Sequence, residues 1–198
     1  GSEMCIRDRN DTVISSSQVF NSNKNQSEYV GYMYTEGEQH GNITNSSIKG
    51  VLDSWYSSNL ASYADKISTE AGFCGDRNLE SGSWSSTGSK LYAAYGRLAD
   101  NKAPTLKCSN SSDLYTTSSS SKGNKKLTNP IGLITADEVS MAGGVFGSNN
   151  NSYYLYNKED YWTMSPSNFR SNLALVFYVR SYGDLNGTNA VSYTHLTL

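Results

Sequence analysis

The residues best suited to covalent or metal chemistry are few in this chain. Between residues 10 and 190 it has two cysteines, Cys74 and Cys108, and a single histidine, His40. Nucleophilic catalysis needs a base beside the nucleophile, and a zinc site needs three or four ligands at characteristic spacing. Two widely separated cysteines and one histidine in a Gly-rich turn provide neither. The sequence therefore predicts no catalytic residues, no metal site and no cofactor.

The two cysteines leave two interpretations open. As free thiols, Cys74 and Cys108 would behave as small buried hydrophobic residues. As a disulfide, they would join two loop segments of a domain poor in aliphatic residues, and would stabilise it by about 2–4 kcal/mol. A redox-active pair would normally have the C-x-x-C spacing, which is absent here.

Oxygen ligands for calcium are present but not in a diagnostic pattern. Asp184 and Asn186 lie in a Gly-containing segment, and Glu159 with Asp160 precedes an aromatic run. Such carboxylates and amides are the ligands that Ca²⁺ prefers. Asp and Asn beside Gly are also ordinary turn formers. We interpret Asp184 and Asn186 as turn residues and predict no calcium site.

The composition favours recognition over electrostatic binding. The 198 residues include 15 Tyr, 3 Trp and 17 Gly, only 17% are charged, and the net charge is −2. This near-neutral balance argues against a nucleic-acid partner. Tyr combined with Ser, Gly and Asn is typical of adaptable recognition loops. We therefore predict that a ligand would contact six residues near the Gly/Asn-rich loops: Tyr153, Tyr154, Phe169, Tyr182, Asp184 and Asn186.

The two ends of the sequence have an unusual origin. Residues 1–9 (GSEMCIRDR) read as a translated sequencing adapter, GGC TCG GAG ATG TGT ATA AGA GAC AG. Residues 191–198 (VSYTHLTL) read as the opposite adapter in the outward direction, GTC TCT TAT ACA CAT CTG ACG CTG. We interpret both as adapter-derived artefacts, which are excluded from fold reasoning. Residues 10–27 are then a linker or edge segment, and 28–190 a single domain with a truncated C-terminal strand.

The hydrophobic pattern predicts an α+β domain. Apolar residues at helical spacing indicate a helix over 48–63. Thr135 and Glu138 form a capping box for a second helix that ends at Gly143. Apolar side chains on both faces of 172–180 place that segment inside a sheet covered on both sides. The other expected elements are strands at 28–35, 131–134, 153–156 and 161–165, a hairpin loop at 183–187, an ambiguous segment at 91–98 and a solvated excursion at 109–126.

The order of these elements resembles the C-type-lectin-like fold. Five separated segments also resemble an uncharacterised domain family of gut Firmicutes surface and pseudopilin-like secreted proteins. They are 49–56 (KGVLDSWY), 73–77 (FCGDR), 132–138 (GLITADE), 153–156 (YYLY) and 161–167 (YWTMSPS). The resemblance implies an antiparallel sheet flanked by two helices, with the first strand paired to the last and long loops carrying any binding site.

The resemblance also implies a setting and a role. It predicts an extracellular or cell-surface module for recognition or adhesion, without enzymatic activity, that binds a glycan or a surface protein. A membrane would be reached only through an N-terminal anchor that is missing here. The alternatives are a pseudopilin-like structural subunit that packs against its neighbours, and an enzyme of the formylglycine-generating type. A secreted setting favours disulfide formation, so we predict a Cys74–Cys108 bridge.

Overall fold

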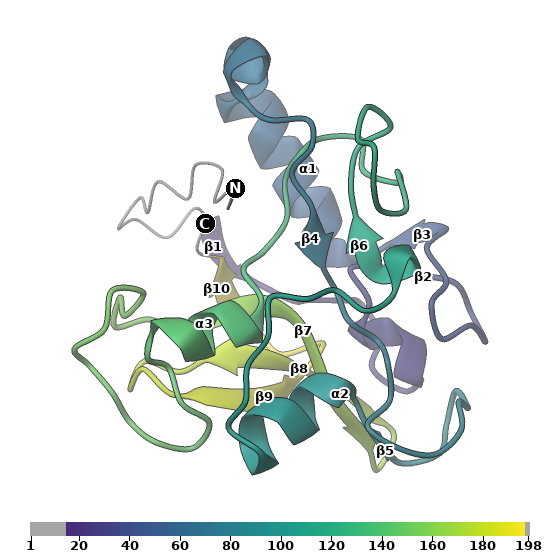
Figure 1. Cartoon of the computed structure of the whole chain (residues 1–198), viewed down its shortest axis with the longest axis vertical. Coiled ribbons are helices and arrows are strands. Elements are labelled where there is room, and N and C mark those ends of the chain that lie inside the picture. The colour runs from purple at the N-terminus through teal and green to yellow at the C-terminus, as the bar shows by residue number, and fades with distance from the viewer. Residues whose placement is uncertain (1–14, 197–198) are drawn as a thin grey trace.

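Figure 1 shows the computed structural model of the chain, which describes residues 15–196. Segment 1–9, interpreted above as adapter-derived, lies outside the described residues, as do 10–14 and 197–198. The described part is a mixed α+β fold with one main, largely antiparallel sheet, which confirms the predicted fold class at that level. In spatial order the strands of this sheet are β1 (Ser15–Gln18), β10 (Thr194–Leu196), β7 (Tyr161–Arg170), β8 (Leu173–Val179) and β9 (Leu185–Asn189), and β5 (Lys90–Leu91) also pairs with β7.

Two helices begin and end where local chemistry requires. α1 (Ser47–Asn59) is capped by Ser46, whose hydroxyl accepts a hydrogen bond from the Lys49 backbone N–H. The predicted helix over 48–63 is therefore present, but its last turn tightens into the 3-10 helix η2 (Ala61–Lys66). In α3 (Ala136–Ala142) both hydrogen bonds of the predicted capping box are formed, and the helix ends at Gly143 with φ 123°. This left-handed geometry favours glycine.

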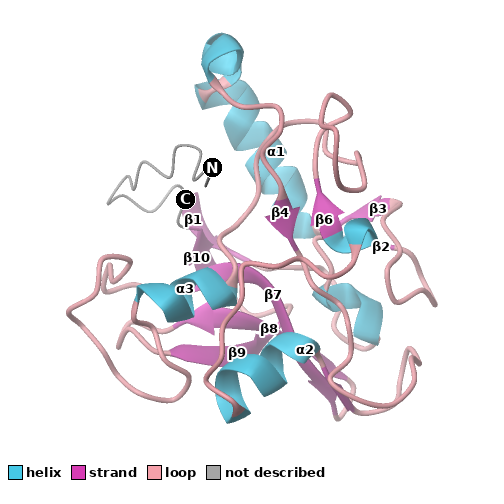
Figure 2. Ribbon diagram, in the orientation of Figure 1, coloured by secondary structure: helices cyan, strands magenta, loops and turns pink. Residues whose placement is uncertain are grey.

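The remaining elements are short and separated by long loops (Figure 2). The ambiguous segment 91–98 is mostly helical, because a single α-turn leads into a π-helical turn. In chain order, the short elements are η1 (Ser27–Val30), β2 (Met33–Tyr34), β3 (Thr44–Asn45), β4 (Phe73–Cys74), α2 (Ala93–Tyr95), the π-helical turn η3 (Gly96–Asp100), η4 (Ser111–Asp113) and β6 (Leu114–Tyr115).

The hairpin of β7 and β8 divides the core into two clusters. Its turn places Ser171 and Asn172 at φ 50° and 57°, the two positive values that suit the twist of a tight hairpin. Successive side chains of β8 point to opposite faces. Val176 joins a cluster with α1 and the N-terminal segment, whereas Phe177 joins a cluster with α2 and α3. The prediction that 172–180 lies inside a sheet covered on both faces is confirmed.

The predicted strand at 28–35 is wrong over most of its length. Its first part is the 3-10 helix η1, and only Met33 and Tyr34 pair with β3. The reason is burial on all sides, since Glu28 to Tyr32 are buried consecutively instead of alternately. The Glu28 carboxylate turns back to accept a hydrogen bond from Gly37 N–H at 2.9 Å. The aromatic residues of this segment pack into the core, and most of the segment makes no strand pairing.

Two further predicted strands are loops. Segment 131–134 is buried in part but has no strand ladder, and the Phe73 ring lies directly against Gly132. Segment 153–156 is a turn, closed by a hydrogen bond from Tyr156 N–H to the Tyr153 carbonyl at 3.0 Å. Tyr161 does begin a strand, as expected, but β7 continues to Arg170.

Segment 109–126 is not a solvated excursion throughout. It contains β6, which pairs with β4, and Tyr115 is fully buried. Asp113 is also fully buried, because Arg77 neutralises it from a distant part of the chain. The Ser/Thr-rich composition hid these inward-facing residues.

The segments near both ends belong to the sheet. Within 10–27, residues 15–18 form β1 at the edge of the sheet, and the centroid of the Phe20 ring lies 5.5 Å from that of Trp162. The return strand after the 183–187 segment is β9, which pairs with β8 over five residue positions. β10 lies in the segment interpreted as adapter-derived, and its backbone pairing with β1 and β7 does not test that origin. Within residues 15–196 no helix has the length and apolar character needed to cross a membrane.

Candidate functional site

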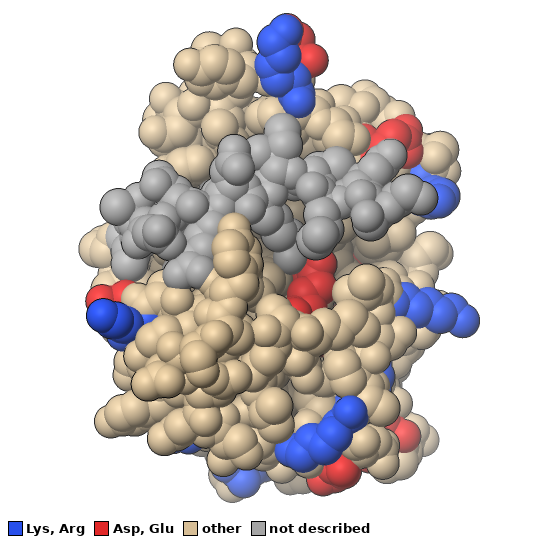
Figure 3. Space-filling view, turned by 60° about the vertical axis from the view of Figure 1, so that its left-hand side comes forward, with Lys and Arg blue, Asp and Glu red and all other residues tan. Residues whose placement is uncertain are grey.

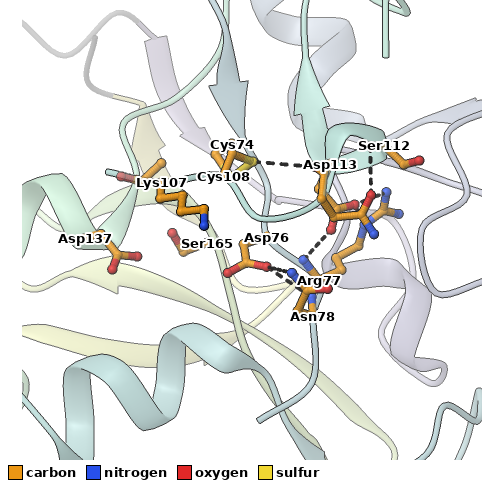
Figure 4. Close-up of a disulfide and its surroundings, with 12 residues drawn as sticks. Cys74, Asp76, Arg77, Asn78, Lys107, Cys108, Ser112, Asp113, Asp137 and Ser165 are labelled. Carbon is orange, nitrogen blue, oxygen red and sulfur yellow. Dashed lines mark hydrogen bonds and ion pairs between the residues drawn. A yellow bond between two sulfur atoms is a disulfide. The ribbon is translucent and has the colours of Figure 1, made fainter. Parts of the chain in front are cut away.

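A cavity of about 210 Å³ lies beside the pair Cys74 and Cys108 (Figure 4). Its walls come from β4, from the extended segment 103–108, from the start of α3 and from the middle of β7. Both apolar and charged side chains line it. The lining residues used below are Phe73, Asp76, Arg97, Leu106, Lys107, Leu133, Asp137, Glu138 and Ser165.

A disulfide fixes one wall of the cavity. Cys74 and Cys108 are joined, with their Cα atoms 5.7 Å apart, within the range that a disulfide spans. The predicted bridge is confirmed. Segment 101–108 has no regular secondary structure, so the bond to β4 replaces the backbone ladder that would otherwise hold it.

Arg97 fixes the opposite wall. It donates from Nη1 to Asp76 at 2.8 Å, and from Nε and Nη2 to Asp137 at 2.9 and 3.0 Å. Asp137 also accepts a hydrogen bond from Thr105 N–H at 2.9 Å. Burial lowers the pKa of Arg97, but the hydrogen bond and charges of these carboxylates outweigh it and raise the pKa above its ordinary value. Both carboxylates are thereby held in place before any ligand binds.

The remaining polar groups point into the same space. Figure 4 shows Lys107 extending from the disulfide-linked segment into the space between Asp76, Asp137 and Ser165. Ser165 accepts a hydrogen bond from Ala136 N–H at 2.9 Å, and this contact ties β7 to the start of α3. The cavity therefore has donors and acceptors on fixed supports, and one lysine on a more exposed segment.

A second buried ion pair lies behind β4 and β6. Asp113 Oδ1 is 2.7 Å from Arg77 Nη2, and Asp113 Oδ2 is 2.9 Å from His40 Nδ1. Arg77 also donates from Nη1 to the carbonyls of Met33 and Gly41. His40 is thus held against a buried carboxylate that Arg77 already pairs, and this group stabilises the fold around the first loop.

The structure does not assemble the six loop residues predicted to bind a ligand. Tyr154 and Tyr182 are 67% and 62% exposed, and their loops are joined by a hydrogen bond from Asn150 N–H to the Tyr182 carbonyl. Tyr153 packs beside Gly143 and Gly144 at the end of α3. Asn186 is partly buried within β9, where it pairs with Tyr178.

The other two residues of that prediction are corrected. Phe169 is 1% exposed and lies near the C-terminal end of β7, where Lys90 Nζ is 5.0 Å from its ring centroid. Asp184 is fully buried because Arg180 donates to its carboxylate at 2.9, 3.0 and 2.5 Å. Neither side chain is available to a ligand at the surface. A Gly/Asn-rich neighbourhood does not distinguish an exposed aromatic residue from one that anchors a loop.

Metal ligands do not gather within the described range. Among residues 15–196 no group of three or more His, Cys, Asp or Glu side chains is arranged to hold a metal ion. Asp160, considered above as an oxygen ligand, accepts a hydrogen bond from Ser181 N–H at 2.6 Å. This hydrogen bond links the residue before β7 to the segment that follows β8.

Sequence reasoning missed the cavity although a signal for it was present. Three of the five segments that carry the family resemblance meet at its walls: 73–77, 132–138 and 161–167. They are far apart in the chain, and only the fold brings them together. Comparison of the chain with family models, with curated proteins and with solved structures finds no match.

Proposed function

We propose that this chain is a non-enzymatic recognition module that works outside the cell and binds a saccharide in the cavity beside the disulfide. The observation that carries the proposal is the preformed cavity itself, with Asp76 and Asp137 held by Arg97. Ligand sites are typically concave, largely preformed and lined by apolar surface with a few fixed polar groups. This cavity has those properties.

The chemistry of the walls favours a saccharide over a charged ligand. Three carboxylates and two cationic side chains line the cavity, so their charges nearly balance. A neutral ligand with many hydroxyls can donate to carboxylates and accept from Lys107, as each hydroxyl both donates and accepts. Phe73, Leu106 and Leu133 offer apolar surface for the C–H face of a sugar ring.

The architecture and surface support the setting. A disulfide is typical of proteins from oxidising compartments such as the cell exterior. Helices packed on both faces of the sheet support the C-type-lectin-like fold that the element order resembles. The face in Figure 3 is mostly uncharged, with scattered Lys, Arg, Asp and Glu, which suits an uncharged ligand better than a polyanion.

A glycan array with matched variants tests the proposal. The wild-type protein is expected to bind a subset of glycans, and Leu106→Trp, which places a large ring at the cavity, is expected to abolish binding. Lys107→Ala is expected to weaken binding by about tenfold or more, since a hydrogen bond to a charged group contributes about 1.5–3 kcal/mol. Lys126→Ala, an exposed lysine outside the cavity, is the control and should bind as the wild type does.

Two results would contradict the proposal. One is the absence of glycan binding by the folded wild-type protein, and concentration-dependent self-assembly in that case would favour the structural-subunit alternative. The other is binding that survives Leu106→Trp but is lost in Tyr154→Ala with Tyr182→Ala. That outcome would move the site to the exposed loop tyrosines.

A further inference from the structure

Lys49, Asp53 and Asn129, none of which lines the cavity, form a hydrogen-bonded cluster. The Lys49 side chain, in the first turn of α1, is only 1% exposed, and its Nζ donates to Asp53 Oδ2 at 2.6 Å. The other oxygen, Asp53 Oδ1, accepts a hydrogen bond from Asn129 Nδ2 at 3.0 Å. A single carboxylate therefore holds a primary amine and a carboxamide next to each other.

The surroundings of this cluster are largely apolar. Leu52 and Ile131 beside it are buried, and the hydroxyl of the buried Tyr32 donates to the Ile131 carbonyl. Burial and, next, the nearby Asp53 charge raise the pKa of Tyr32, which places Asp53 close to this core. The Asp53 carboxylate lies within hydrogen-bond distance of the Lys49 amine, which is the distance that proton transfer requires.

We propose that Lys49 and Asn129 join through an intramolecular amide bond, with Asp53 as the catalytic acid and base. Asp53 takes a proton from the Lys49 ammonium, and the free amine attacks Cγ of Asn129. Asp53 then delivers that proton to the departing Asn129 nitrogen, the Cγ–Nδ2 bond breaks, and ammonia leaves. The second amine proton goes to Asp53 and on to ammonia. The products are one amide and one ammonium ion, so atoms and charge balance with no other reactant.

The geometry explains why this amine and this carboxamide would react. A reaction between groups that hydrogen-bond to the two oxygens of one carboxylate is effectively unimolecular, which removes much of the entropic barrier. The bond would close the chain between residues 49 and 129 into a ring that encloses the Cys74–Cys108 disulfide. Both cross-links would then constrain the loops that shape the cavity.

Intact-mass spectrometry of the purified, fully reduced protein provides the test. The expected mass is lower than the sequence mass by one ammonia molecule, and protease digestion should release a branched peptide that contains Lys49 and Asn129. In denaturing, reducing electrophoresis the cross-linked chain should migrate faster than an unlinked variant, because its ring keeps it compact. A wild-type mass equal to the sequence mass would overturn the proposal.

Three variants separate this reaction from other losses of ammonia. Lys49→Arg keeps the charge beside Asp53 but lacks the nucleophile, and Asp53→Asn lacks the proton carrier. Both variants should therefore have the mass calculated from their own sequences, with no loss of ammonia. Asn129→Asp should lose one water molecule instead of ammonia. Circular dichroism spectra like that of the wild type establish that Lys49→Arg is folded. Loss of ammonia that persists in Lys49→Arg would place the reaction elsewhere and refute the proposal.

Discussion

Replacement of Asp113 by Asn should destabilise the fold more than any other single removal of a charge discussed here. Arg77 is fully buried and the Asp113 side chain is 1% exposed, with contacts of 2.7 Å from Nη2 and 2.9 Å from Nε. Asn keeps the shape of Asp but leaves the guanidinium with only carbonyl partners. Breaking one side of a buried ion pair costs about 3–5 kcal/mol. This is a large fraction of the total stability of about 5–15 kcal/mol that a domain has.

Urea unfolding of Asp113→Asn at neutral pH measures this loss. For a chain of this size, 3–5 kcal/mol corresponds to a fall in Tm of about 6–20 °C. Asp65→Asn is the matched control, because Asp65 and Lys66 are 69% and 74% exposed and their ion pair should contribute less than about 1 kcal/mol. If Asp113→Asn unfolds within about 1 kcal/mol of the wild type with an unchanged denaturant slope, the reasoning about this pair is wrong.

Three further predictions concern the disulfide, a helix cap and alkaline pH. The double substitution of Cys74 and Cys108 by Ser should lower the free energy of unfolding by about 2–4 kcal/mol in urea titrations, and an unchanged midpoint would show that the bridge constrains little. Thr135→Ala should cost about 1 kcal/mol in thermal unfolding, because it removes the N-cap of α3, whereas a neutral result would make that cap dispensable. Burial raises the pKa values of Tyr92 and Tyr115 above the ordinary 10.0, so unfolded tyrosines lose protons at lower pH than folded ones. Stability should therefore be full below about pH 10 and fall as the pH rises further, with tyrosinate absorbance appearing together with unfolding, and independent titration of all tyrosines in the folded state would contradict this.

Elements specified by local chemistry could be predicted from the sequence. The capping box at Thr135 and Glu138 fixes the start of α3 with two hydrogen bonds between residues three apart, so its signal needs no tertiary context. The apolar residues on both faces of 172–180 likewise required a strand covered on two sides. The Cys74–Cys108 bridge followed from the small number of cysteines together with a resemblance to secreted proteins.

Elements specified by distant contacts could not be predicted in this way. Glu28 to Tyr32 reads as a strand because of its aromatic content, yet burial on all sides turns it into η1. Asp113 lies in a Ser/Thr-rich stretch, and nothing local indicates that Arg77 pairs with it in the core. A pairing between residues far apart in sequence depends on the fold, which periodicity does not encode.

The candidate site shows the same division. The loop residues were predicted from residue type alone. Phe169 is buried because it lies at an inward-facing position of β7, and Asp184 is buried in an ion pair with Arg180. The cavity is made by Asp76, Arg97 and other residues from six separate segments, so their proximity became visible only in three dimensions. Residue types indicate which chemistry is available, whereas topology decides which residues meet.

Amide chemical-shift mapping with the tightest-binding saccharide from the array tests the central claim most directly. If the sugar binds beside the disulfide, the largest shifts should occur at the cavity walls, at the amides of Phe73, Leu106, Lys107 and Glu138. They should saturate together with a single Kd. Shifts confined to the loops of Tyr154 and Tyr182, or no shifts at saturating sugar, would contradict the assignment of the cavity as the binding site.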